Sequence, residues 1–93
     1  MEVNNVYNII YLDKVTSRDI PKLSPPIKAM VKSAIEEKLL ADPIKFGKPL
    51  RYNLKNSRSL RIGDYRVIYQ IENITIQILK IGHRRDCYDY ERS

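Results

Sequence analysis

The spacing of apolar residues in the first part of the chain predicts one strand followed by a short helix. The stretch VYNIIYL, residues 6–12, is β-branched and aromatic, which is typical of a strand. Thr16 and Ser17 are suited to cap a helix that runs towards Leu23. Pro21 limits this helix, because proline is tolerated only in a first turn.

A second, longer helix is predicted from Ser24, a suitable N-cap, with Pro25 at the first helical position. Apolar residues then recur at the i, i+3, i+4 spacing of one helix face: Ile27, Met30, Val31, Ala34, Ile35 and Leu39. The helix is expected to end near Ala41, before Asp42-Pro43. A loop rich in Lys, Gly and Pro is expected from about Pro43 to Pro49.

Alternation replaces helical spacing in the second half and predicts strands at about residues 59–62, 65–72 and 74–81. Gly63-Asp64 predicts a tight hairpin, because glycine admits positive φ, and Asn73 marks the next turn. The tail DCYDYERS is expected to add a turn of helix or to pair with a partner. The order β-α-α-β-β-β therefore predicts an α+β fold: a mostly antiparallel four-stranded sheet with a helical hairpin packed on one face.

Successive residues of a strand face opposite sides of the sheet, so the alternation also places the arginines. Arg66 is expected to share its face with Ile68 and Gln70, while Tyr65, Val67, Tyr69 and Ile71 take the other. Arg61 is expected to face away from its neighbours Leu60 and Ile62. We expect both arginines near the hairpin, beside the segment that ends the last strand: Gly82, His83, Arg84 and Arg85.

The length of 93 residues and the absence of a linker predict a single domain over residues 1–93. No apolar run approaches the ~20 residues of a membrane-spanning helix, and the N-terminus lacks the basic region of a secretory signal. The lone Cys87 excludes an intramolecular disulfide and fits a reducing, cytoplasmic location.

The net charge of +6 is concentrated in one part of the sequence. Ten of the seventeen Lys and Arg residues lie between Lys45 and Arg85, a segment with only two acidic residues. A concentrated basic segment favours a polyanion as partner, although a merely solvated basic surface has the same composition. The seven tyrosines add rings that could stack on bases or serve as ordinary core-edge residues.

Two blocks of sequence resemble a known family. GKPLRYNLKNSRSLRIGDYRVIYQI, followed by LKIGHRRDCY, is similar to the RelE branch of the RelE/ParE toxins of bacterial and archaeal toxin–antitoxin pairs. The resemblance covers essentially the whole chain and is strongest over residues 47–71 and 80–88. It implies a RelE-like fold and a small basic endoribonuclease that cuts mRNA in the ribosomal decoding site. It also implies a cognate RelB-like antitoxin that holds the enzyme inactive.

The resemblance implies five catalytic candidates. Arg66 matches the arginine that contacts the scissile phosphate, and Arg84 matches a second arginine at that phosphate. Tyr88 matches the tyrosine that stacks on a base, and His83 a position that is histidine in several members. Arg61 matches the basic residue on the strand before the hairpin, where some members have a lysine as proposed base. Further candidates for binding ribosomal RNA or message are Lys48, Arg51, Lys55, Arg58 and Arg85.

The chemistry of RNA cleavage fits these residue types. RNA can be cut without a metal or cofactor when its own 2′-OH attacks the adjacent phosphate, and arginine is suited to neutralise the charge that gathers there. Histidine is the natural proton-transfer group near neutral pH, whereas arginine is a poor base. The general base therefore remains open between His83, Tyr88 and no single residue. A metal site is not expected, because Cys87 lacks ligand spacing.

Two other functions fit parts of the same pattern. ParE-like members of the superfamily share the fold but inhibit DNA gyrase, and they tend to lack the basic and aromatic set kept here. A non-catalytic RNA- or ribosome-binding module would also explain the charge distribution. Each candidate residue has an ordinary structural role as an alternative: strand arginines are often solvated, and histidines and tyrosines often serve packing. No membrane partner is expected.

Overall fold

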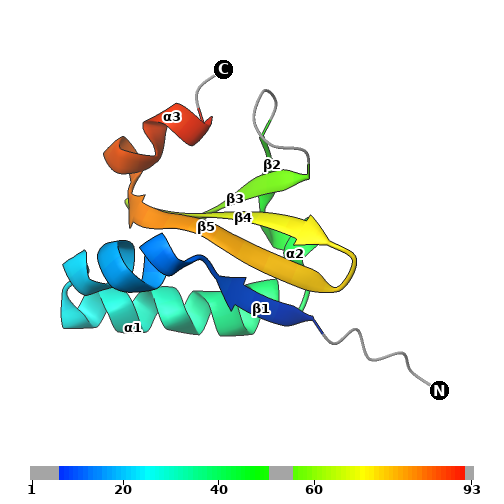
Figure 1. Cartoon of the computed structure of the whole chain (residues 1–93), viewed down its shortest axis with the longest axis horizontal. Helices are drawn as coiled ribbons and strands as arrows, with labels where there is room; N and C mark the ends of the chain where they lie inside the picture. The colour runs from blue at the N-terminus through cyan, green and yellow to red at the C-terminus, as the bar shows by residue number, and fades with distance from the viewer. Residues whose placement is uncertain (1–6, 51–55, 92–93) are drawn as a thin grey trace.

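Five strands form one sheet in the computed structural model, which describes residues 7–50 and 56–91. The strands are β1 (Asn8–Tyr11), β2 (Lys48–Pro49), β3 (Ser57–Ile62), β4 (Tyr65–Glu72) and β5 (Thr75–His83). Their order across the sheet is β1-β5-β4-β3-β2, with β1 parallel to β5 and the other neighbours antiparallel (Figure 1). The predicted α+β fold is confirmed, with one strand more than expected.

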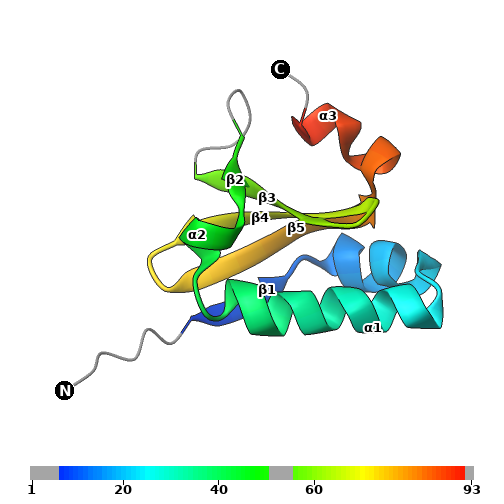
Figure 2. The same cartoon turned by 180° about the vertical axis from the view of Figure 1, so that it is seen from behind.

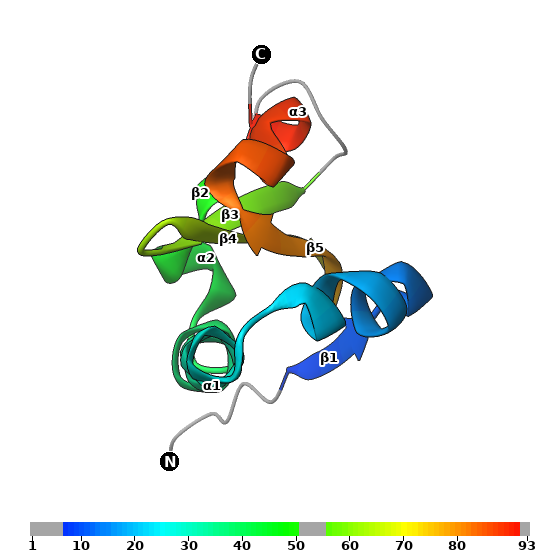
Figure 3. The same cartoon turned by 90° about the vertical axis from the view of Figure 1, so that its left-hand side faces the viewer.

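Helical segments cover both faces of the sheet. On one face lies the predicted helical hairpin: η1 (Val15–Asp19), η2 (Ile20–Lys22), α1 (Pro25–Ala34) and η3 (Ile35–Leu39). On the other face, after β5, lie η4 (Arg84–Cys87) and α3 (Tyr88–Glu91). Figure 3 shows α1 and α3 on opposite sides of the strands, and we call these sides the α1 face and the α3 face. The tail thus forms the expected turn of helix.

The predicted loop at residues 43–49 is wrong, because the structure has α2 (Pro43–Phe46) and β2 there (Figure 2). Asp42 is the N-cap of α2, and its side chain accepts a hydrogen bond from the Lys45 amide at 3.0 Å. Pro43 occupies the first helical position, which needs no amide donor. The Asp-Pro pair was therefore a start signal for a new helix as well as the end of the previous one.

Apolar residues of the α1 face form the main core. Val31, Ile35 and Leu39 of the helical hairpin are buried there against strand residues that include Leu60, Val67, Tyr69, Ile76, Ile78 and Ile81. Ile68 and Leu79 form a smaller cluster on the α3 face together with Cys87. The expected division of β4 into Val67 and Tyr69 on one side and Ile68 on the other is therefore confirmed.

Two tight turns set the ends of the strands. Gly63 has φ of 58° in the two-residue loop between β3 and β4, which confirms the predicted hairpin. Asn73 has φ of 57° between β4 and β5, as expected for a residue that tolerates this conformation. In residues 7–50 and 56–91, no helix is long and apolar enough to cross a membrane.

Candidate functional site

Arg61 and Arg66 lie directly opposite each other across the β3–β4 hairpin. Directly opposed residues share a face, and for this pair it is the α3 face. Arg61 is exposed, whereas Arg66 is only 6% exposed. Nη1 of Arg66 donates to the carbonyl oxygens of Gly63 at 3.0 Å and Tyr65 at 2.9 Å. The Arg66 guanidinium is thus held against the turn by two main-chain carbonyls.

Arg84 is brought to the same turn by its backbone. Its main-chain N–H donates to the carbonyl oxygen of Asp64 at 2.7 Å, which ties the start of η4 to the hairpin loop. The Arg84 side chain is exposed. The structure therefore brings the three predicted catalytic arginines to one end of the sheet: Arg61, Arg66 and Arg84.

His83 does not join this group. It pairs with Tyr65 in the β4–β5 ladder, while Arg66 pairs with Gly82, so alternation places His83 and Arg66 on opposite faces. The rings of Tyr65 and His83 are in edge contact, with centroids 5.4 Å apart at 74°. Nδ1 of His83 accepts a hydrogen bond from the Arg85 amide at 3.3 Å. Neutral His83 therefore carries its hydrogen on Nε2.

The two described tyrosines of the tail differ in exposure. Tyr88, the predicted base-stacking residue, is 60% exposed at the start of α3. Tyr90 is half-buried against the Ile68 cluster, and its hydroxyl accepts a hydrogen bond from Lys14 Nζ at 3.2 Å. Tyr88 is thus the more exposed residue of the pair.

The predicted RNA-binding residues are divided between surfaces. Lys48 is exposed and opposes Ser59, which places it on the α3 face with Arg61, and Arg85 is exposed on η4. Arg51 and Lys55 lie outside the described residues.

Arg58 lies on the α1 face, opposite Tyr69 in the β3–β4 ladder. Its Nη2 donates to the carbonyl oxygens of Ile44 at 2.6 Å and Gly47 at 2.8 Å. These bonds join α2 and the residue after it to β3. Arg58 therefore has a structural task and is separated from the other arginines.

A polar pocket of about 400 Å³ lies at the edge of β5 that β1 leaves open, because the pairing with β1 ends at Ile78. Its lining is contributed by η1, η2, the residue after η2, β4, β5 and η4: Asp19, Lys22, Leu23, Tyr65, Lys80, Ile81, Gly82, His83, Arg85 and Asp86. We call it the β5-edge pocket. Three lining residues were not predicted from the sequence: Asp19, Lys22 and Lys80. For Asp19 the sequence did offer an indication, because it is an acidic residue within a helix that was expected to pack on the sheet.

Asp19 closes the inner side of this pocket and is 6% exposed. Its Oδ2 accepts a hydrogen bond from the Ile81 amide at 3.0 Å, and its Oδ1 lies 3.3 Å from Lys80 Nζ. The carboxylate thus replaces a strand partner for the open edge of β5. In the described ranges no three His, Cys, Asp or Glu side chains gather in a group that could hold a metal ion.

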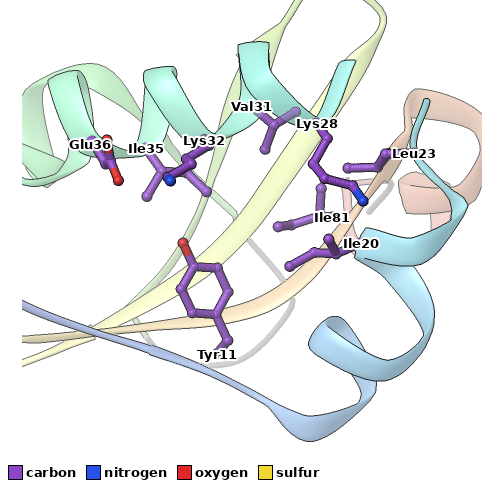
Figure 4. Close-up of a pocket in the computed structure, with 9 residues that line it drawn as sticks. All are labelled: Tyr11, Ile20, Leu23, Lys28, Val31, Lys32, Ile35, Glu36 and Ile81. Atoms are coloured by element: carbon purple, nitrogen blue, oxygen red, sulfur yellow. The ribbon is translucent and has the colours of Figure 1, made fainter. Parts of the chain in front are cut away.

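A second pocket, of about 220 Å³, separates α1 from β1 (Figure 4). Figure 4 shows Tyr11 rising from β1 towards α1, between apolar side chains that include Ile20, Val31 and Ile35. Burial raises the pKa of Tyr11, and the nearby Glu36 charge raises it further. With mostly apolar walls, this pocket is unsuited to a phosphate.

The chain matches known toxin sequences over most of its length. Residues 10–88 match the family profile described as ParE toxin of type II toxin–antitoxin system. Toxin RelG of Mycobacterium tuberculosis is 42% identical over 73 residues, which cover 76% of this chain and 84% of that protein. Toxin RelE of the same organism is 33% identical over 81 residues, covering 85% of this chain and 84% of that protein.

Solved structures agree with these sequence matches. The toxin–antitoxin complex RelBE2 from M. tuberculosis contains a chain that is 36% identical, with a TM-score of 0.76, covering 85% of this chain and 99% of that one. The isolated E. coli RelE toxin aligns with a TM-score of 0.68 over 84% of both chains. At 16% identity, this second likeness shows the fold alone.

Proposed function

The chain belongs to the RelE-type toxins of type II toxin–antitoxin systems, and we propose that it cleaves messenger RNA in the decoding site of the ribosome and so inhibits translation. The observation that carries this proposal is the gathering of three arginines at one end of the sheet. Arg61 and Arg66 are directly opposed on the α3 face, and the backbone of Arg84 is bonded to the same hairpin loop.

In the proposed reaction the 2′-hydroxyl of the message gives up its proton to water and its oxygen attacks the adjacent phosphorus. The bond to the 5′-oxygen breaks, and this oxygen takes up a proton from water. The products are a 2′,3′-cyclic phosphate and a free 5′-hydroxyl, so no metal or cofactor is required. Arg66 and Arg84 neutralise the charge that develops on the phosphate oxygens, as preorganised donors do. The exposed ring of Tyr88 stacks on a base and orients the strand.

His83 is a weaker candidate for proton transfer than a histidine at a cleavage site usually is. Neutral His83 has its free hydrogen on Nε2, which makes this nitrogen a donor, and the ring lies on the α1 face. Arg61 is unsuited to the role of base, because a guanidinium has no acceptor atom. We therefore propose that positioning and charge stabilisation by the arginines supply most of the rate.

A ribosome cleavage assay tests the proposal. Purified toxin is incubated with ribosomes programmed with a defined message, and the 5′ ends of the products are mapped. We expect cuts in ribosome-bound message only, strongly reduced in Arg66→Ala and Arg84→Ala. Lys38→Ala, which removes an exposed cation on η3, is the control and is expected to cleave normally. Intact message on programmed ribosomes, with folded wild-type toxin, would contradict the proposal.

Inhibition of DNA gyrase is the second candidate function, favoured by the ParE description of the matching family profile. The same protein preparation is assayed for gyrase supercoiling. We expect no inhibition at toxin concentrations that cleave message. Inhibited supercoiling together with uncut message would favour gyrase as the target.

A RelB-like antitoxin is the proposed protein partner, and the cytoplasm the proposed location. The support is the 36% identical chain, whose structure is a toxin–antitoxin complex. Partly disordered segments that fold on binding can cover large surfaces of a small protein. Affinity purification of the chain from its native host is expected to recover a small antitoxin-like protein in stoichiometric amount. Recovery of the free chain would contradict this partner.

A further inference from the structure

We propose that the β5-edge pocket binds a second phosphate group of the RNA strand, apart from the scissile phosphate at Arg66 and Arg84. This inference rests on the proposed ribonuclease function, because it takes RNA as the ligand. The pocket volume of about 400 Å³ lies within the range of small-ligand sites. Its location on the open edge of β5 is distinct from the α3 face that carries Arg61 and Arg66.

Hydrogen-bond donors enter this pocket from distant parts of the sequence. Lys22 comes from η2, while His83 and Arg85 come from the end of β5 and from η4. Lys22 and Arg85 are exposed and can move onto a ligand. His83 is held in place by the Arg85 amide on Nδ1 and by ring contact with Tyr65. Its Nε2–H is therefore a fixed donor, which suits a phosphate oxygen.

The acidic residues of the lining do not cancel this preference. Asp19 is paired with Lys80 Nζ and accepts from the Ile81 amide, so its charge is already compensated within the protein. Asp86 is exposed. Three basic residues line the pocket with two acidic ones, which leaves a positive excess before His83 is counted: Lys22, Lys80 and Arg85 against Asp19 and Asp86.

The position of η4 connects the pocket with the proposed cleavage site. Arg84 is tied by its amide to the hairpin loop beside Arg66, while the next residue, Arg85, lines the β5-edge pocket. Arg84 and Arg85 are consecutive residues of η4, so one short segment carries both a residue at the hairpin loop and a residue of the pocket. This continuity favours a phosphate of the same RNA strand over an unattached phosphate ion.

The first test measures the affinity of the toxin for programmed ribosomes. The message carries a 2′-O-methyl group at the cleavage nucleotide, so that it stays intact. Lys22→Gln and Arg85→Gln are each expected to weaken binding roughly five- to tenfold. The slope of log affinity against log salt is expected to fall by about 0.7 for each lost phosphate contact. Lys38→Gln, the matched control outside the pocket, is expected to bind like wild type. Unchanged affinity in both pocket variants would overturn the proposal.

The imidazole signals of His83 in the intact toxin give an independent test by nuclear magnetic resonance. A short 2′-O-methylated RNA is expected to shift the Nε2 signal in wild type, and the shift is expected to shrink in Lys22→Gln. A shift with inorganic phosphate that RNA neither produces nor displaces would overturn the assignment to RNA.

The two proposals can fail separately. Weaker binding in Lys22→Gln without message cleavage by wild type would uphold the pocket and reject the nuclease. Cleavage that depends on Arg66, with normal RNA binding in Lys22→Gln and Arg85→Gln, would do the reverse.

Discussion

Two arginines of strand β3, three positions apart, show opposite uses of one side chain. Arg58 is half-buried on the α1 face and donates to two main-chain carbonyls, of Ile44 and Gly47. Arg61 is exposed on the α3 face and opposes Arg66 across the hairpin. The first arginine joins α2 and the residue after it to β3, and the second is open to solvent.

The difference shows that the face and the neighbours of an arginine determine its task. Arg58 meets carbonyls left by the end of the short helix α2, and a guanidinium is suited to bond several of them at once. Arg61 and Arg66 lie opposite each other with like charge, which is unfavourable for folding and is tolerated more readily at a functional site. The residue type alone does not separate these cases.

The largest expected effect is a difference in message cleavage between a variant of Arg66 and a variant of Arg58. Arg66→Ala is expected to lower the rate of message cleavage about 100- to 1000-fold, because a preorganised donor to the phosphate is lost. Arg58→Met is expected to leave the rate per folded molecule within about twofold of wild type. The measurement is single-turnover cleavage on programmed ribosomes, with the folded fraction determined by circular dichroism. Equal losses in both variants would break the distinction between the two regions.

Stability is expected to show the opposite order. Arg58→Met removes two charge-assisted hydrogen bonds and is expected to lower the free energy of unfolding by about 3 kcal/mol. Arg61→Met, the matched change three residues further on, is expected to change it by less than about 0.5 kcal/mol, because the side chain is exposed. Urea unfolding of both variants measures these values. A larger loss in Arg61→Met would contradict the assignment.

Gly47 tests the fit of the segment that Arg58 holds. A Cβ atom added to Gly47 would lie 1.8 Å from the Tyr69 hydroxyl oxygen, which cannot easily withdraw because Tyr69 is fully buried. Gly47→Ala is expected to cost about 2 kcal/mol in unfolding free energy, as overpacking does. The control is Gly82→Ala, whose added Cβ would meet its nearest atom at 3.5 Å. Similar losses in both variants would argue against a tight fit at Gly47.

Much of the fold could be predicted from the sequence because its signals are local. The turn at Gly63-Asp64 and the alternation through β4 are enough to place Arg61 and Arg66 near the hairpin and on one side of the sheet, where the β3–β4 register confirms them. The short elements α2 and β2 could not be predicted as easily. A strand of two residues carries no alternation, and it exists because it pairs with β3.

The candidate site was predictable only in part, for a related reason. Placing His83 needs the β4–β5 register as well as alternation within one strand, and this register pairs it with Tyr65 on the α1 face. Asp19 and Lys80 are 61 positions apart, and only the tertiary fold brings them into contact. Arg58 carries the same motif signal as its neighbours, yet α2 takes its guanidinium away from solvent.

The smallest expected effect concerns Tyr69, which lies beside Arg58. Its hydroxyl donates to the Pro43 carbonyl at 2.5 Å, and burial raises its pKa to about 12, although the Arg58 charge opposes this shift. Above the ordinary pKa near 10, the unfolded chain loses this proton while the folded chain keeps it, so stability falls as pH rises from 10 towards 12.

Between pH 8 and pH 11, wild type is therefore expected to lose about 1.4 kcal/mol relative to Tyr69→Phe, which has no such proton. The other tyrosines are common to both proteins and cancel in the comparison. Urea unfolding of both proteins at the two pH values measures this loss of stability. A stability difference between the two proteins that stays the same at both pH values would contradict the raised pKa. In an Arg58→Met background the loss of stability should continue to higher pH. The cation that favours the ionised phenol is gone there, so the pKa of Tyr69 rises further. That result would show that the arginine bonded to α2 also lowers the pKa of Tyr69. An unchanged pH range of the stability loss would contradict this link.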